Sequence, residues 1–167
     1  MPIKNIQINK VDAKGISPAC TFPDNLTTKI KQEIALKSMP LGAKVGDFTT
    51  VIIDDMIFVN YVLNVVIPNN RDTLYSISVC IDEHENPLRI KTVLETIVSE
   101  LKACNAVTPK VLDTFAKKLY QAFQGTTTEI KITKNIIISI KSFNAEEEEE
   151  EEEKKSDIES RFEEELW

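Results

Sequence analysis

The sequence predicts an α+β fold built on an antiparallel sheet. Before residue 82, five segments rich in β-branched and aromatic residues are separated by turn-forming residues, as strands are. Between residues 86 and 125 the apolar residues recur instead at intervals of three and four, which is typical of helices that bury one face. The chain has 167 residues, of which 42% are hydrophobic, so it is long enough to bury one core without disulfide bonds.

The first three elements are expected to be a strand, a strand and a helix, at residues 3–11, 16–22 and 23–38. A turn at residues 12–15 joins the two strands. Pro18 has no backbone N–H, so the second strand should lie at a sheet edge or be short. The helix should end near residue 38, because the residue before Pro40 is disfavoured in a helix.

Three further strands are expected at residues 48–53, 56–66 and 73–81. Asp54-Asp55 is a plausible tight turn between the first two, and residues 67–72 form a polar loop before the third. Together these strands indicate an antiparallel meander.

Two amphipathic helices follow the meander. Asn86-Pro87 supplies an N-cap and a proline at the first helical position, and one apolar stripe runs from Ile90 to Leu101. Thr108-Pro109 repeats this start for a second helix, which should continue without a break to the residues before Gly125. Two such helices need a shared apolar surface, and the sheet is the only candidate.

The end of the chain divides into a hairpin and an acidic tail. A final β-hairpin is expected at residues 128–142, which completes a domain at residues 1–143. Residues 144–167 contain 13 Asp/Glu against three Lys/Arg, a net charge of −10, whereas the preceding residues carry +3. Because the run Glu146–Glu153 repels itself and has nothing to bury, we expect the tail to be largely disordered or loosely helical.

The last residues of the tail allow two interpretations. Ile158, Phe162 and Leu166 are spaced by four, so a short terminal helix would align them, with Trp167 at the edge of the stripe. The segment is either a frayed terminus without a role or a helix that binds a groove of a partner or of its own domain.

The segment SMPLGAKVGDFTT, residues 38–50, superficially resembles a phosphate-binding loop. A phosphate loop follows a strand, precedes a helix and carries a lysine, but here a helix precedes, strands follow and Asp47 takes the place of the lysine. We therefore interpret the segment as a corner in which Gly42 and Gly46 permit the chain reversals between helix and strand.

No catalytic or metal site can be assembled from the sequence, and we expect neither a cofactor nor an enzymatic activity. Cys80 and His84 supply at most half of a zinc site, and His84 is the only histidine. The three cysteines are widely spaced and odd in number, which is typical of reduced thiols in a cytoplasmic protein. The longest apolar run is interrupted by polar residues, so no membrane span is expected, and the lack of a Lys/Arg block argues against nucleic acid as a partner.

The element order and several segments resemble the longin family, in particular archaeal longin-like proteins. The segments are Gly15–Phe22 before the first helix, Ala35–Pro40 with Gly46-Asp47-Phe48, Tyr61 on a central strand, and Arg71 before Leu74–Val79. The resemblance covers residues 3–124 and implies a profilin-like, five-stranded antiparallel sheet with one helix on one face and two on the other. Roadblock domains share this architecture. The hairpin and the acidic tail depart from the plain longin pattern.

This resemblance implies a non-enzymatic interaction module, an adaptor or regulator that binds small Ras-like GTPases or other longin or roadblock proteins in membrane trafficking, as a homodimer or heterodimer. Candidate contacts are Asp47, Arg71 and Asp72 in the two loops, and Phe162 and Trp167 in the tail. Arg71 could instead pair with a neighbouring carboxylate. A second functional class is a charge-based chaperone or decoy, whose acidic tail binds basic proteins.

Overall fold

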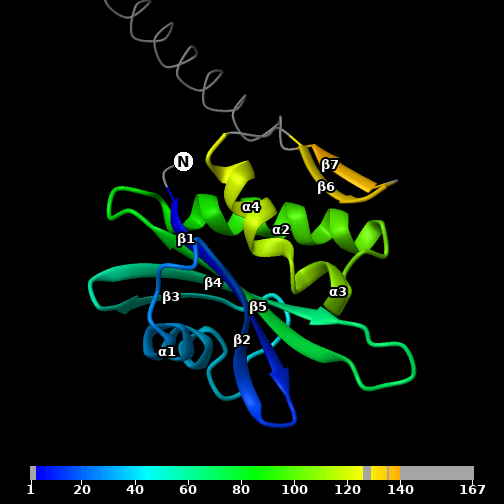
Figure 1. The fold of residues 1–167 in the computed structure, drawn as a ribbon, viewed down its shortest axis with the longest axis horizontal. Coiled ribbons are helices and arrows are strands. Elements are labelled where there is room, and N and C mark those ends of the chain that lie inside the picture. The colour runs from blue at the N-terminus through cyan, green and yellow to red at the C-terminus, as the bar shows by residue number, and fades with distance from the viewer. Residues whose placement is uncertain (1–2, 126–128, 135, 140–167) are drawn as a thin grey trace, which may run out of the picture.

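The computed structural model describes residues 3–125, 129–134 and 136–139 (Figure 1). Five strands form one antiparallel sheet in the order β2-β1-β5-β4-β3. These strands are β1 (Ile3–Asp12), β2 (Gly15–Phe22), β3 (Phe48–Ile53), β4 (Met56–Val65) and β5 (Thr73–Ile81). The prediction of an α+β fold with a five-stranded antiparallel sheet is confirmed. Strand β2, which contains Pro18, lies at an edge as predicted.

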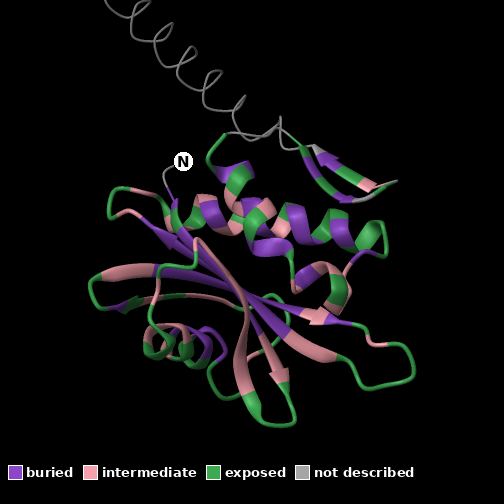
Figure 2. Cartoon of the chain, viewed as in Figure 1, coloured by how far each residue is buried: buried purple, intermediate pink, exposed green. Residues whose placement is uncertain are grey.

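The helices cover the two faces of the sheet separately. Helix α1 (Thr28–Ser38) packs on one face, whereas α2 (Pro87–Ala103), α3 (Pro109–Leu112) and α4 (Phe115–Phe123) lie on the other side (Figure 1). Alternate residues of β4 show this division, because Val59 joins the core beneath α2 and α4 while Phe58 joins the cluster beneath α1. The α2 and α4 side holds the larger core, and Figure 2 shows the buried positions along these helices and the central strands. Within the described residues, no helix has the length and apolar character needed to cross a membrane.

The predicted turn and the predicted cap of α2 are present in the structure, but the first helix begins later in the chain than predicted. Asp54 and Asp55 both have positive φ values, 46° and 62°, as a two-residue hairpin turn requires. Asn86 caps α2 by accepting a hydrogen bond from the Leu88 N–H at 3.0 Å. The predicted start of the first helix at residues 23–25 is wrong. The helix begins at Thr28, because the Thr27 hydroxyl rather than an upstream group accepts the Ile30 N–H and caps it.

The prediction of one continuous helix after Pro109 is also wrong. Asp113 and Thr114 separate α3 from α4. The Thr114 hydroxyl donates to the Val111 carbonyl at 3.2 Å, so this side chain competes with the backbone hydrogen bonds that would continue the helix. Phe115 directly after the break is nevertheless fully buried, and the apolar positions of both pieces face the core.

The C-terminal hairpin forms a second, two-stranded sheet. Strand β6 (Glu129–Thr133) pairs with β7 (Ile136–Ser139), within the predicted range of 128–142. Ile130, Ile132 and Ile138 are buried against the core that α4 also lines, which fixes the hairpin on this side of the molecule. The ends of the predicted hairpin and the predicted tail at residues 144–167, including Phe162 and Trp167, lie outside the described residues.

Candidate protein-interaction site

Strand β3 leaves one edge of the main sheet unpaired within the described part of the chain. Its sequence, FTTVII, contains no charged residue, no proline and no glycine. The other edge is protected, since β2 contains Pro18 and its pairing with β1 is interrupted by a register shift next to Asn9. Uncharged edge strands present backbone groups that another strand can pair with, so β3 is the exposed pairing edge of this sheet.

The hairpin turn determines which β3 residues direct their backbone outward. A two-residue turn makes Ile53 and Met56 a hydrogen-bonded pair, and such pairs alternate along antiparallel strands. Thr49 and Val51 therefore also bond to β4, while Phe48, Thr50 and Ile52 direct their N–H and C=O groups away from it. The Val62 N–H donates to the Asp47 carbonyl at 3.0 Å, two residues before Thr49, which agrees with this alternation.

Apolar side chains flank this edge. Ile52 is 65% exposed, and Leu88 in the first turn of α2 is 64% exposed. One turn further along α2, the Lys91 ammonium lies 5.7 Å from the centroid of the Phe48 ring, which places this flank of α2 beside β3. We call Phe48–Ile53 together with Leu88 the β3 edge surface. It combines free backbone groups with exposed hydrocarbon.

Next to the start of β3, three loops enclose a pocket of about 570 Å³. The antiparallel pairing of β3 and β4 brings the loop before β3 and the loop after β4 to the same end of the sheet. The end of α2 and the α2–α3 connection complete the wall. The pocket is lined by Val45, Asn64, Val66, Pro68, Lys102, Asn105, Val107 and Thr108. We call it the loop pocket. The first two loops were predicted from the sequence as candidate contacts, whereas the third, in which Asn105 has a positive φ of 52°, was not.

The structure places Asp47, Arg71 and Asp72 in the two loops at this end of the sheet. Asp47 accepts the Lys44 N–H at 2.7 Å, and Asp72 accepts the Asn64 side-chain amide at 2.8 Å. Both carboxylates thus stabilise their own loops. The Arg71 side chain is exposed and has no ion-pair partner among the described residues.

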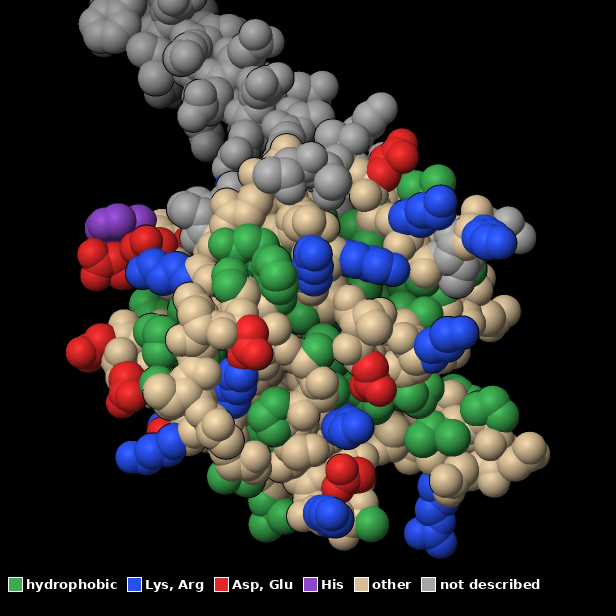
Figure 3. Space-filling model, in the orientation of Figure 1, with side chains coloured by type: hydrophobic (Ala, Val, Ile, Leu, Met, Phe, Trp, Pro, Cys, Tyr) green, Lys and Arg blue, Asp and Glu red, His purple; other side chains and the backbone are tan. Residues whose placement is uncertain are grey.

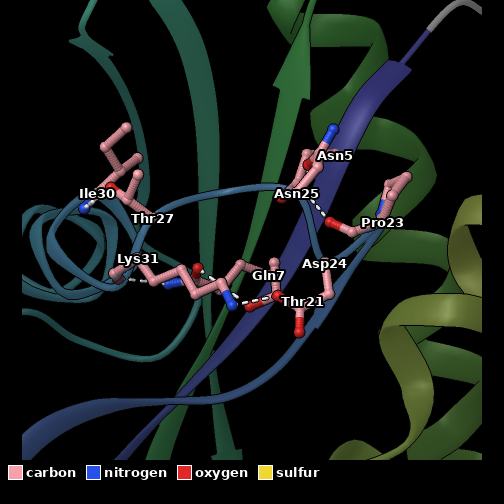
Figure 4. Close-up of polar contacts among 9 residues, drawn as sticks. All are labelled: Asn5, Gln7, Thr21, Pro23, Asp24, Asn25, Thr27, Ile30 and Lys31. Atoms are coloured by element: carbon pink, nitrogen blue, oxygen red, sulfur yellow. Dashed lines mark hydrogen bonds and ion pairs between the residues drawn. The ribbon is translucent and has the colours of Figure 1, made fainter.

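Helix α1 rests on a layer of buried polar side chains, a second feature that the sequence reasoning missed. We call it the polar layer, and it comprises Asn5, Gln7, Asn9, Ser38, Asn60, Ser76 and Ser78. The Gln7 side chain donates to the Lys31 carbonyl of α1 at 2.7 Å and to Asn9 Oδ1 at 2.6 Å. Figure 4 shows Gln7 between Thr21 of β2, which donates to it at 3.2 Å, and Lys31.

Asn9 lies at the centre of the polar layer. Its amide nitrogen lies 3.0 Å from the hydroxyl oxygens of Ser76 and Ser78, and 3.3 Å from that of Ser38. Ser38 in turn donates to the Ala35 carbonyl at 2.7 Å. These hydrogen bonds connect β1 and β5 to backbone carbonyls of α1. All of the groups are neutral, so the polar layer positions α1 and carries no charge for chemistry.

The Cys20 thiol is partly shielded from solvent and the Cys80 thiol is buried. Burial raises the pKa of Cys80 to about 11 and also raises the pKa of Cys20. Both thiols therefore keep their protons at neutral pH and are poor nucleophiles. His84 is exposed and lies 3.5 Å from Glu83. Among the described residues, no group of three or more His, Cys, Asp or Glu side chains could hold a metal ion.

Comparison of the sequence with protein-family models and with curated proteins finds no match.

Proposed function

We propose that this chain is a non-enzymatic interaction module of longin-like architecture that binds a protein partner through the β3 edge surface. The observation that carries the proposal is an uncharged edge strand with three outward-facing backbone positions, flanked by exposed Ile52 and Leu88. A partner strand added to β3 would satisfy these backbone groups, and pockets for its alternate side chains would give specificity.

The class of partner rests on the resemblance of residues 3–124 to longin proteins. We propose a small Ras-like GTPase, or another longin or roadblock protein, in an adaptor or regulatory complex of the kind that acts in membrane trafficking. The sheet order and the placement of one helix on one face and the longer α2 and α4 on the other support this architecture. Pairing through β3 would also accommodate a second copy of the chain.

The loop pocket supplies a second contact beside the same edge. Val45 and Val66 expose apolar surface there, and Lys102 adds positive charge. A partner segment with an apolar side chain followed by an acidic one would fit these groups. Asp47 and Asp72 hold the two loops in place, so we expect their replacement to weaken binding indirectly.

A binding panel tests the proposal. The full chain would be immobilised and exposed to purified small GTPases, each loaded with GDP or a GTP analogue, and to purified longin and roadblock proteins. Ile52→Lys should weaken binding of the true partner at least tenfold, because the new charge opposes strand pairing. Ile137→Lys is the matched control, since Ile137 is also an exposed isoleucine but lies on β7 in the other sheet.

A second variant tests the contribution of the β3 backbone to binding separately from the contribution of the Ile52 side chain. Thr50→Pro removes an outward N–H without removing a hydrogen bond to β4, so circular dichroism should remain native while binding falls. A panel in which no protein binds, or in which the Ile52 and Ile137 variants lose binding equally, overturns the proposed function.

A further inference from the structure

The positive charge of the described structure is concentrated around α4 and the hairpin. Residues 109–134 contain five lysines but only Asp113 and Glu129 as acids, a net charge of +3. Residues 1–86 contain eight Lys/Arg and ten Asp/Glu, a net charge of −2. Figure 3 shows lysine and arginine side chains gathered over α4 and the hairpin. We call this surface the lysine face. It consists of Lys110, Lys117, Lys118, Lys131 and Lys134.

The charges of the lysine face are not neutralised by the described residues. None of its five ammonium groups has an ion-pair partner there. The Lys117 ammonium lies 5.7 Å from the centroid of the Phe22 ring, a cation–π contact that leaves its charge uncompensated. Elsewhere among the described residues four lysines form ion pairs, among them Lys4 with Asp82 at 3.5 Å and Lys37 with Glu33 at 2.8 Å.

The chain also leaves the described structure on this side. The buried isoleucines of β6 and β7 fix the hairpin on the core that α4 lines, and β7 ends at Ser139. Only residues 140–145 separate that point from the first glutamate of Glu146–Glu153. An extended chain of this length spans about 20 Å, and the eight glutamates span at most about 28 Å. The whole acidic run is thus within reach of the lysine face.

We propose that Glu146–Glu153 binds the lysine face of the same chain. The two partners have opposite charge, and the short connection between them gives an effective concentration in the millimolar range. Binding of this kind needs no deep groove, because each carboxylate can meet any of the lysines. The acidic run therefore covers the lysine face, and any other polyanion must displace it before it can bind there.

Zero-length cross-linking tests directly whether Glu146–Glu153 lies against the lysine face. The full chain, mixed in equal parts with ¹⁵N-labelled full chain, would be treated with a carbodiimide that joins carboxylates to amines. Trypsin releases the glutamate run in one peptide, residues 142–154, because Lys141 and Lys154 flank it. We expect cross-links from this peptide to the lysine face at least fivefold more often than to Lys29 and Lys44, which are exposed on and after α1. The two peptides of each cross-link should both be labelled or both be unlabelled, because a link within one chain joins peptides of the same isotope composition.

Salt and charge reversal identify the force involved. The Debye length falls from about 10 Å at 0.1 M salt to about 3 Å at 1 M, so the cross-links should decrease at least fivefold between these conditions. Lys117→Glu with Lys118→Glu should decrease them by a similar factor. The matched control, Lys29→Glu with Lys44→Glu, changes the net charge equally and should leave them unchanged.

Three outcomes would overturn the proposal. They are cross-links spread evenly over all exposed lysines, cross-links that join only chains of different isotope label, and cross-links that survive the Lys117 and Lys118 reversal. Circular dichroism verifies that each variant is folded. If the α4 variant unfolds, Lys131→Glu with Lys134→Glu on the hairpin provides the same test.

Discussion

Replacing Asn9 with alanine tests whether the polar layer holds α1 on the sheet. The substitution removes the one side chain that connects Gln7 to the serines of β5. It leaves the backbone of β1 unchanged, because alanine adopts strand geometry without strain. The deleted amide is fully buried, so no bulk water replaces it directly.

The expected loss follows from the contacts of this side chain. Asn9 Oδ1 accepts from Gln7 at 2.6 Å, and its amide lies 3.0 Å from the hydroxyls of Ser76 and Ser78. A buried hydrogen bond contributes a net ~0.5–1.5 kcal/mol, and an orphaned buried partner costs ~1–3 kcal/mol. Asn9→Ala should therefore lower the free energy of unfolding by about 2–4 kcal/mol, a large part of the ~5–15 kcal/mol typical of a domain.

Urea denaturation followed by far-ultraviolet circular dichroism measures this loss. Tryptophan fluorescence is unsuitable, because the single tryptophan is Trp167 in the tail. Asn64→Ala is the matched control. It removes an amide that is only half-buried and makes one hydrogen bond, to Asp72, so it should cost less than about 1 kcal/mol. If Asn9→Ala lies within about 0.5 kcal/mol of the unmodified protein, the hydrogen bonds of the polar layer do not stabilise the fold.

Asn86→Ala removes the side chain that caps α2 and should cost about 1 kcal/mol in the same denaturation experiment, whereas the unchanged stability of the variant would contradict the cap. Burial raises the pKa of Cys80 from 9.0 to about 11 and that of Tyr75 from 10.0 to about 12. The native state then keeps protons that the unfolded state loses, so these two groups should lower the free energy of unfolding as the pH rises from about 9 to about 12. Tyr75→Phe should reduce the loss of stability between about pH 10 and pH 12. A pH profile identical to that of the unmodified protein would refute the raised pKa of Tyr75. Exposed Cys104 should react with a thiol reagent at pH 8 while Cys80 reacts roughly 100-fold more slowly, as timed mass spectrometry of the native protein would show; equal rates would contradict the burial of Cys80.

Sequence patterns predicted the main sheet well, because its determinants are local. Strands β3 and β5 have the predicted bounds, since each is a run of β-branched and aromatic residues closed by turn residues. The Asp54-Asp55 turn and the Asn86 cap act within a few residues of the chain, and both are present. The break at Asp113 and Thr114 was missed, because two residues of low helix propensity are usually tolerated inside a strong apolar stripe.

The polar layer could not be predicted from the sequence. Gln7 and Asn9 alternate with Ile6 and Ile8, a pattern that is typical of a strand with one face in water. Their burial depends on α1, which crosses this face and supplies the Lys31 carbonyl as a partner. Periodicity reports which residues share a face, but it does not report what covers that face.

The candidate site was predicted in part for a related reason. The loops that contain Asp47 and Arg71 were identified from their turn chemistry, and the antiparallel pairing of β3 with β4 brings them together. The α2–α3 connection joins them only through the packing of α2 on the sheet, which no local signal specifies. The exposed edge of β3 depends on the strand order, and several orders are compatible with the same set of strands.

The polar layer has a consequence for the heat capacity of the molecule. Exposing amides and hydroxyls to water lowers the heat capacity, whereas exposing hydrocarbon raises it. A local opening that lifts α1 would expose the amides and hydroxyls of the polar layer together with the small apolar cluster around Ile34 and Phe58, while unfolding of the α2 and α4 side would expose the larger apolar core. The two faces of one sheet therefore respond differently to temperature. We expect the free energy of opening α1 to curve less with temperature than the free energy of global unfolding, because the polar layer offsets part of the heat-capacity change.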